Sequence, residues 1–395
     1  MRSTFFRGTA VLAAAALALA ACGGETTASG GGKPPPLAAA TSVGTGEGQL
    51  NLIAWAGYAE DGTNDPKVDW VTPFEQSTGC KVNVKVGNTS DEMVTLMKTG
   101  QYDGVSASGD ATLRLIYGGD VAPVNTALVP NYQTVSDFLK DRPWNSVDGK
   151  MYGIPHGWGA NVLSWRADKV KTAPDSWSVV FDGNSPYKGR ITAYDSPIYI
   201  ADAALYLKAT QPNLKITNPY ELDDKQFAAA VDLLKKQKTI VGEYWADYTK
   251  AVNALESGDT VLGTEWQVNV NLANQNGKVK VDSTVPKEGA TGWSDTWMIA
   301  AKAKHPNCMY KWMDHIIAPK VNAQVAEWFG EAPAQTLSCA ETADKNHCTV
   351  YHAEDKAYAD RISYWTTPTK DCGDSRGATC KDYAAWTQAW TEIKG

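Results

Sequence analysis

The chain has 395 residues, a formal net charge of −7 and 43% hydrophobic residues. This length exceeds that of one typical domain and suits two lobes. The mildly acidic charge and the lack of any long Lys/Arg run in the sequence argue against nucleic-acid binding. The 15 tryptophans are typical of core packing, but those beside Gly, Asp or Ser also suit the aromatic walls of a ligand cleft.

Residues 1–21 have the pattern of an export signal. Arg2 and Arg7 precede a short apolar run rich in alanine, as in secretory signals. The run is too short to span a bilayer as a mature helix. Its last residues, Leu-Ala-Ala followed by Cys22, resemble a bacterial lipobox. This resemblance implies a diacylglycerol on Cys22 and a protein anchored at the extracytoplasmic face of the cell membrane. The alternative is an ordinary secretory signal in which Cys22 is incidental.

Residues 22–48 are rich in Gly, Ser, Thr, Ala and Pro and contain almost no large apolar side chains. Such a segment cannot bury a core. We therefore expect a disordered tether between the lipid-bearing cysteine and the folded body.

The remaining six of the seven cysteines predict three disulfides, because an even number is typical of exported chains. Local spacing favours two short loops and leaves one long-range pair. A metal site is the alternative, but the sequence has no Cys-x-x-Cys or paired His-Cys spacing, so we expect neither metal nor cofactor. The predicted disulfides are Cys339–Cys348, Cys372–Cys380 and Cys80–Cys308.

Strand and helix patterns alternate after the tether. Residues 49–55 and 80–86 are predicted strands, and residues 70–79 and 90–100 are predicted helices. Ser90 can cap the second of these helices. The alternation indicates an α/β fold with a largely parallel sheet, on which ligands bind at the carboxyl ends of strands.

The pattern continues towards the C-terminus. Residues 226–238 and 247–257 are predicted amphipathic helices, and residues 260–264 and 297–300 are predicted strands. Glycines on both sides of Trp158 suit a hinge between two lobes.

The order of the motifs resembles the periplasmic spermidine/putrescine-binding proteins of ABC importers. This resemblance covers residues 50–370 and implies a type II periplasmic-binding-protein fold, with two α/β lobes, a hinge and a ligand cleft between them. The segments that carry it are residues 55–58, 102–108, 152–159, 256–266 and 286–295.

The resemblance also divides the chain. Residues 49–158 with 293–320 are expected to form lobe one, and residues 159–292 with 321–395 are expected to form lobe two. The long-range cysteine pair then lies within lobe one.

Several residues fall on positions that line the family's pocket. Trp293 and Asp295, two apart on an extended segment, point to the same side. A carboxylate and aromatic faces offset the lost hydration of a buried ammonium, so we expect Asp295 to pair with an ammonium group. The full set is Trp55, Tyr58, Ser108, Trp266, Trp293 and Asp295.

The chain departs from the family in places. Where polyamine binders carry an acid pair in lobe two, this chain has Asp195, displaced along the chain, and Tyr199. Asp110 stands in lobe one where an aromatic residue is usual. All three are candidate ligand contacts, and the number of ammonium sites stays open.

The expected role is capture of a small cationic amine, by closure of the lobes about the hinge. A monomer would deliver the amine to a membrane permease coupled to a cytoplasmic ATPase. The same fold could instead carry an amino-acid-like compound, a quaternary amine or an oligosaccharide, or serve a sensing lipoprotein. A secreted enzyme is disfavoured because common catalytic motifs are missing from the sequence.

Overall fold

The computed structural model describes residues 33–275 and 277–395, so the expected signal sequence and Cys22 lie outside the described residues. The strands are β1 (Gln49–Ala54), β2 (Lys81–Val86), β3 (Gly104–Ala107), β4 (Ser146–Val147), β5 (Lys150–Met151), β6 (Ile154–Arg166), β7 (Ile191–Tyr194), β8 (Val241–Trp245), β9 (Leu262–Trp266), β10 (Val281–Thr284), β11 (Ala290–Ile299), β12 (Ala332–Pro333) and β13 (Ile362–Tyr364). The α-helices are α1 (Val71–Thr78), α2 (Ser90–Met97), α3 (Gly109–Gly118), α4 (Ser178–Phe181), α5 (Ile200–Thr210), α6 (Asp224–Lys238), α7 (Tyr248–Ser257), α8 (Gln267–Gln275), α9 (Pro306–Ile316), α10 (Pro319–Phe329), α11 (Ser338–Glu341), α12 (His347–Val350), α13 (Lys356–Ala359) and α14 (Tyr383–Lys394). The 3-10 helices are η1 (Thr126–Leu128), η2 (Pro130–Thr134), η3 (Asp137–Leu139), η4 (Pro197–Tyr199) and η5 (Pro212–Leu214). In the part of the chain that the structure describes, no helix has the length and hydropathy needed to cross a membrane.

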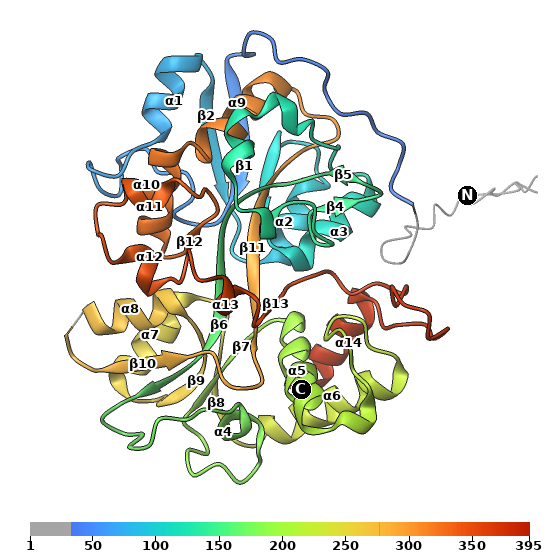
Figure 1. Ribbon diagram of the computed structural model, residues 1–395, viewed down its shortest axis with the longest axis vertical. Helices are drawn as coiled ribbons and strands as arrows, with labels where there is room; N and C mark the ends of the chain where they lie inside the picture. Colours follow the sequence, from blue (N-terminus) through green and yellow to red (C-terminus); the bar gives the residue numbers. More distant parts are fainter. Residues whose placement is uncertain (1–32, 276) are drawn as a thin grey trace, which may run out of the picture.

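One path of hydrogen-bonded strands runs through the molecule in the order β2-β1-β3-β11-β6-β9-β7-β8. The strand β1 pairs in parallel with β2 and β3, and β7 pairs in parallel with β8 and β9. Two long strands, β6 and β11, are antiparallel to each other and to the strands next to them, β9 and β3. Figure 1 shows them passing from an upper half, around β1 to β3, to a lower half, around β7 to β10. The predicted α/β fold is confirmed, with antiparallel strands joining two parallel sets.

The glycines on both sides of Trp158 lie where β6 meets β11, and Gly157 and Gly159 pair there with Asp295 and Trp293. A Cβ on Gly159 would come within 2.8 Å of the Trp293 ring. A Cβ on Gly157 would come within 1.9 Å of the carboxyl carbon of Glu331. These two glycines therefore make room for side chains that cross over the strand.

Helix α2 begins one residue away from the predicted cap. Thr89 precedes the helix in extended conformation and accepts a hydrogen bond from the Glu92 amide at 3.1 Å. The prediction that Ser90 caps this helix is thus wrong. The Ser90 hydroxyl is free to donate elsewhere, and it does so to Asp110.

Residues 35–47, which we predicted to be part of a disordered tether, pack on the upper half. Ala40 and Val43 are half-buried against the core, and the Ala40 carbonyl accepts from Asn125 Nδ2 at 3.1 Å. Glu47 accepts from the backbone amides of Asn307 and Cys308 at 2.9 and 3.0 Å, at the start of α9. The tether prediction is wrong for this part, because small apolar side chains and one capping acid suffice to dock it.

Replacing Glu47 with alanine should release the docked segment. Loss of a cap costs about 1 kcal/mol, so amides in residues 40–47 should exchange with deuterium roughly five-fold faster than in the unchanged protein. Peptide-level hydrogen exchange measures this, with Glu341→Ala as a control at an exposed glutamate. Exchange of residues 40–47 at the rate of an unstructured peptide in the unchanged protein would show that the segment is not docked.

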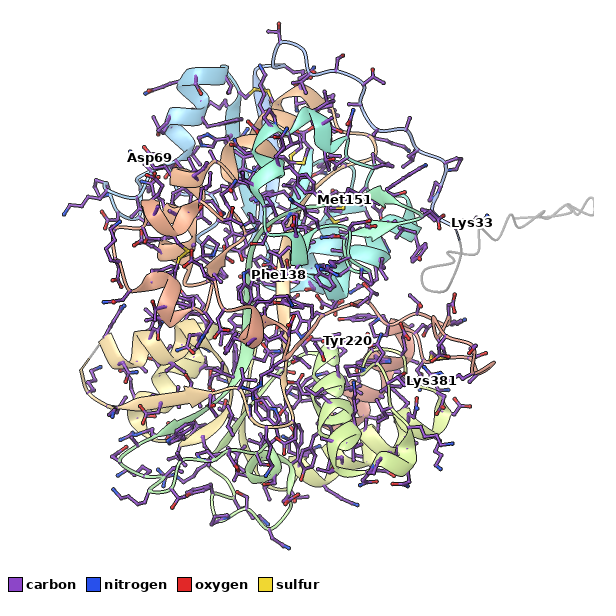
Figure 2. All side chains as sticks on the ribbon, in the orientation of Figure 1. Lys33, Asp69, Phe138, Met151, Tyr220 and Lys381 are labelled. Atoms are coloured by element: carbon purple, nitrogen blue, oxygen red, sulfur yellow. A yellow bond between two sulfur atoms is a disulfide. The ribbon has the colours of Figure 1, made fainter. Side chains whose placement is uncertain are left out.

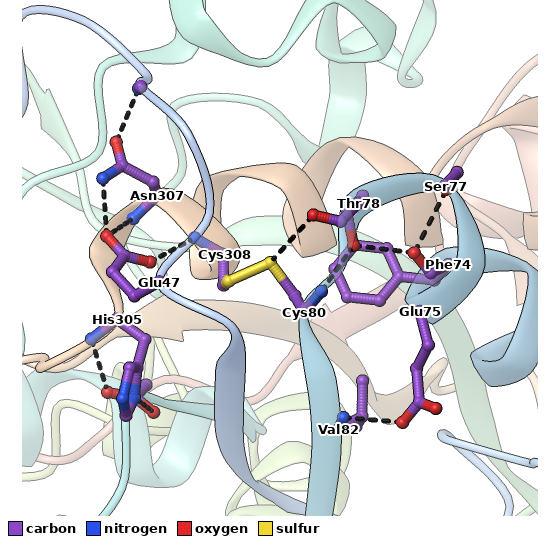
Figure 3. The surroundings of a disulfide bond; sticks show 12 residues. Glu47, Phe74, Glu75, Ser77, Thr78, Cys80, Val82, His305, Asn307 and Cys308 are labelled. Carbon is purple, nitrogen blue, oxygen red and sulfur yellow. Dashed lines mark hydrogen bonds and ion pairs between the residues drawn. A yellow bond between two sulfur atoms is a disulfide. The ribbon is translucent and has the colours of Figure 1, made fainter.

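The three predicted disulfides are present in the structure. Cys339–Cys348 and Cys372–Cys380 close short loops, whereas Cys80–Cys308 joins residues that are 228 positions apart. Figure 3 shows this last bond between the start of β2 and the first turn of α9, next to Glu47. Both cysteines are fully buried, so the bond ties two distant parts of the chain inside the upper half.

Residues 321–395, which we assigned to lobe two, lie in two places. Helix α10 packs against α9 and β12, on the side of α1 in Figure 1. Helix α14 instead packs against α6 and η4 in the lower half. Between them, β13 pairs in parallel with β11. The segment thus belongs to both halves, and between them it pairs with β11, one of the two strands that join the halves.

Candidate functional site

Asp295 lies on β11, at the point where the pairing with β6 shifts register. Its side chain is almost fully buried and accepts two hydroxyl hydrogen bonds, from Tyr58 at 2.8 Å and from Ser108 at 2.5 Å. Burial raises the pKa of Asp295 to about 6, against the lowering effect of His156 and the two hydroxyls. The structure therefore brings together three residues that the sequence nominated.

Tyr58 also contacts a second carboxylate that sequence reasoning missed. Its hydroxyl lies 3.0 Å from Glu331 Oε2, between α10 and β12. Glu331 is fully buried, and its Oε1 lies 3.5 Å from Nδ1 of the buried His156. The sequence signal was present, because an acid between a glycine and Ala332-Pro333 is unusual in an apolar stretch.

A continuous set of aromatic rings leads away from this carboxylate pair. The Phe329 ring lies 4.2 Å from Tyr58 and 6.0 Å from Trp293, between ring centroids. Trp266 lies 6.4 Å from Trp293 and 5.5 Å from Tyr194. These faces can hold the apolar part of a cationic ligand and stabilise its charge.

The C-terminal segment adds a ring to this set. The Trp365 amide donates to the Gly292 carbonyl at 2.7 Å, directly after β13. Its indole stacks on Tyr194 with centroids 5.7 Å apart and an angle of 15° between the rings. Neither Tyr194, at the end of β7, nor Trp365 was predicted. Trp365 reaches this place only because β13 pairs with β11.

Three predicted tryptophans have indole N–H groups that point to no protein acceptor. Trp55 and Trp266 are half-buried and Trp293 is buried. None of their Nε1 atoms has a hydrogen-bond partner within the described ranges. They can donate to an acceptor on a bound molecule.

Asp110 lies in the first turn of α3 and is buried. Its carboxylate accepts a hydrogen bond from Ser90 at 2.9 Å, and burial raises its pKa to about 7. Burial is the largest cause of the raised pKa of Tyr194, and the negative charges of Asp110 and Asp295 raise it further. Both acids therefore act on the same ring. Asp110 is thus electrostatically coupled to the aromatic set.

The two lower-half candidates have partners of their own. Asp195 accepts from Lys394 Nζ at 2.6 Å and from Trp390 Nε1 at 3.0 Å, both on α14. The buried Tyr199 hydroxyl lies 3.2 Å from Thr264 Oγ1 and accepts from Gln237 Nε2 at 3.0 Å. The structure does not bring either residue to Asp295.

A cavity of about 370 Å³ opens beside α3, between the two halves. Tyr117 and Asp148 line it from the upper half, and Tyr220 and Glu221 line it from the lower half. Figure 2 labels Tyr220 near the middle of the molecule. Asp371 adds a further acid, and these acids outnumber Lys33 on the walls, so the walls favour a cation. Across residues 33–275 and 277–395, the cavity included, no group of three or more His, Cys, Asp or Glu could hold a metal ion.

Known proteins resemble this chain in sequence. A family model described as "Bacterial extracellular solute-binding protein" matches residues 69–349. The putrescine-binding periplasmic protein SpuD of Pseudomonas aeruginosa is 24% identical over 363 residues, which cover 87% of this chain and 91% of that protein.

Two solved structures share the fold. The spermidine/putrescine ABC transporter substrate-binding protein PotD from Streptococcus pneumoniae matches with a TM-score of 0.68 and 16% identity, over 88% of this chain and 97% of its own. The PBP MotA from A. tumefaciens B6, solved with glucopine, matches with a TM-score of 0.67 and 14% identity, over 88% of this chain and 100% of its own. These likenesses confirm the predicted periplasmic-binding-protein fold.

Proposed function

The chain belongs to the bacterial extracellular solute-binding protein family, and from this premise we propose that it captures a small cationic amine of the putrescine type. The observation that carries this proposal is Asp295, a buried carboxylate held by two hydroxyl donors beside aromatic rings. An ammonium needs such a carboxylate once its hydration is lost, and the rings add favourable cation–π contact. Members of this family bind solutes and do not transform them.

The number of acids supports a diamine. Asp295 and Asp110 are both buried, and each accepts a hydroxyl hydrogen bond, from Tyr58 and Ser90 respectively. Asp195 is already paired with Lys394, so it has less to offer a third ammonium group. The Asp295–Glu331 pair and Asp110 would each meet one end of a putrescine-like ligand.

The proposed delivery of the ligand to a permease follows from the expected membrane anchor and from the fold. A lipid on Cys22 would keep the protein on the outer face of the cell membrane. Ligand contacts from both halves would favour a closed state about the β6–β11 crossing. The closed form would then dock on an ABC permease, whose cytoplasmic ATPase drives import.

An amino-acid-like ligand is the second candidate. The unpartnered indole N–H groups of Trp55, Trp266 and Trp293 could donate to a carboxylate, while Asp295 holds the ammonium. A structural neighbour was solved with glucopine, so the fold accommodates ligands other than polyamines.

A thermal-shift panel tests the proposal. A ligand that binds the native state raises the melting temperature by mass action. Putrescine, agmatine or spermidine should raise it, whereas maltose, which lacks an ammonium group, should not. A rise with 4-aminobutyrate alone would favour the second candidate, and a rise with maltose alone would contradict both.

A further inference from the structure

We propose that capture of a cationic ligand at this site expels a proton that Glu331 and Asp295 share through Tyr58. This inference rests on the proposed function. It adds that the affinity for the ligand depends on pH and that Glu331, which no motif nominated, belongs to the binding site.

The hydrogen-bond geometry requires this proton. Tyr58 Oη lies 2.8 Å from Asp295 Oδ2 and 3.0 Å from Glu331 Oε2, both of which are hydrogen-bond distances. A tyrosine hydroxyl carries one hydrogen, so it can donate to one carboxylate only. With both acids ionised, the other contact would set two oxygen lone pairs against each other in a buried place. A proton on one carboxyl group turns that contact into a second hydrogen bond.

The two carboxyl groups differ in the donors that reach them. Asp295 accepts from Ser108 as well as from Tyr58, and donors favour the ionised form of an acid. Glu331 has no donor other than Tyr58 among the side chains that the structure describes, and its Oε1 has no hydrogen-bond partner there. Tyr58 keeps its own hydrogen, since burial raises its pKa well above the ordinary value.

None of the other ionisable side chains in the described residues donates a hydrogen bond to the Glu331 carboxyl group. His156, on β6, lies 3.5 Å from Glu331 Oε1, which is longer than the 2.7–2.9 Å of a charge-assisted hydrogen bond. His347, on α12, contacts the backbone carbonyl of Glu331, and burial lowers its pKa. The remaining neighbours by charge are Asp295, Tyr58 and Tyr351.

The exchange conserves charge. Before capture, the two carboxyl groups and one proton carry a single negative charge. When a ligand ammonium arrives, it pairs with the carboxylates, and the proton leaves to solvent. The buried site thus keeps the same net charge, and the cost of burying a second unpaired carboxylate is avoided.

Protons and ligand compete for the same carboxylates, and this competition sets the direction in which the affinity changes with pH. The affinity for the ligand should rise with pH over the range in which the acids lose their shared proton. The slope is at most about tenfold per pH unit for one proton. Acidification outside the membrane would therefore weaken capture.

Calorimetric titration with putrescine in two buffers of different ionisation enthalpy counts the protons released. Asp110, whose pKa is raised to about 7 by burial, adds its own proton in every variant, so the difference between variants is the quantity that counts. At pH 6 the unchanged protein should release up to about one proton per ligand more than Glu331→Gln, because the variant has no shared proton and has lost the charge that raises the pKa of Asp295. Glu265→Gln, at another fully buried glutamate, should release as many as the unchanged protein. Equal release by Glu331→Gln and the unchanged protein would overturn the proposal.

A second measurement needs no ligand, so it separates this inference from the proposed function. Infrared difference spectra between the unchanged protein and Glu331→Gln, both without ligand at pH 6, should show the carbonyl band of one protonated carboxyl group. Burial raises the pKa of Asp110 to about 7 and of Asp202 and Glu265 to about 8, so their own bands occur in both proteins and cancel. Glu265→Gln should lose only the band of Glu265 and keep the band that Glu331→Gln removes. A spectrum unchanged by Glu331→Gln would overturn the shared proton even if putrescine binds.

Discussion

Replacing Asp295 with alanine should weaken putrescine binding by roughly two to four orders of magnitude. Removing one partner of a buried charge pair costs about 3–5 kcal/mol, and each 1.4 kcal/mol is a factor of ten. The loss should be large because Asp295 is buried and the Tyr58 and Ser108 hydroxyls already hold it in place. Calorimetric titration at pH 7.5 measures the dissociation constant of the variant.

Asp202→Asn is the matched control for this change. Asp202 is also a buried acid, and its carboxyl accepts one hydroxyl hydrogen bond, from Thr291 at 2.9 Å. Burial raises the pKa of Asp202 to about 8, so asparagine resembles its neutral form. Asp202→Asn should bind putrescine with a dissociation constant within about threefold of that of the unchanged protein. A loss of affinity below tenfold for Asp295→Ala would contradict the assignment of Asp295 to an ammonium group.

Removing the Cys80–Cys308 disulfide should have the largest effect on stability. In the chain-entropy model, a cross-link across 228 positions stabilises the fold by about 5 kcal/mol, and one across 8 positions by about 3 kcal/mol. The paired change Cys80→Ala with Cys308→Ala should therefore lower the free energy of unfolding more than the corresponding change at Cys372 and Cys380.

Urea denaturation of the two double variants gives the comparison. The urea midpoint should fall further for the long-range pair, with a similar slope in both variants. An equal or smaller fall would mean that packing of α1, β2 and α9 holds this region without the covalent bond.

Much of the site could be predicted because its residues lie in local motifs. Asp295 and Trp293 share one extended segment, and Tyr58 and Ser108 follow strands whose ends meet at one edge. The cysteine pairs could be predicted from spacing, because two short loops leave one remaining pair.

The missed residues depend on contacts between distant parts of the chain. Glu331 reaches Tyr58 across 273 positions, and Lys394 reaches Asp195 across 199. Neither contact is indicated by a hydrophobic pattern in the segments that make it. The segment at residues 35–47 was misjudged for a related reason, because composition records its lack of large side chains but not the core residues against which Ala40 and Val43 pack.

The most direct test of the central claim is calorimetric titration of the purified protein with putrescine and, separately, with 4-aminobutyrate and maltose. We expect saturable binding of putrescine, with 4-aminobutyrate weaker by roughly tenfold or more because it lacks the second ammonium group. We expect no binding of maltose. Tight binding of maltose with no binding of putrescine would contradict the amine site built around Asp295.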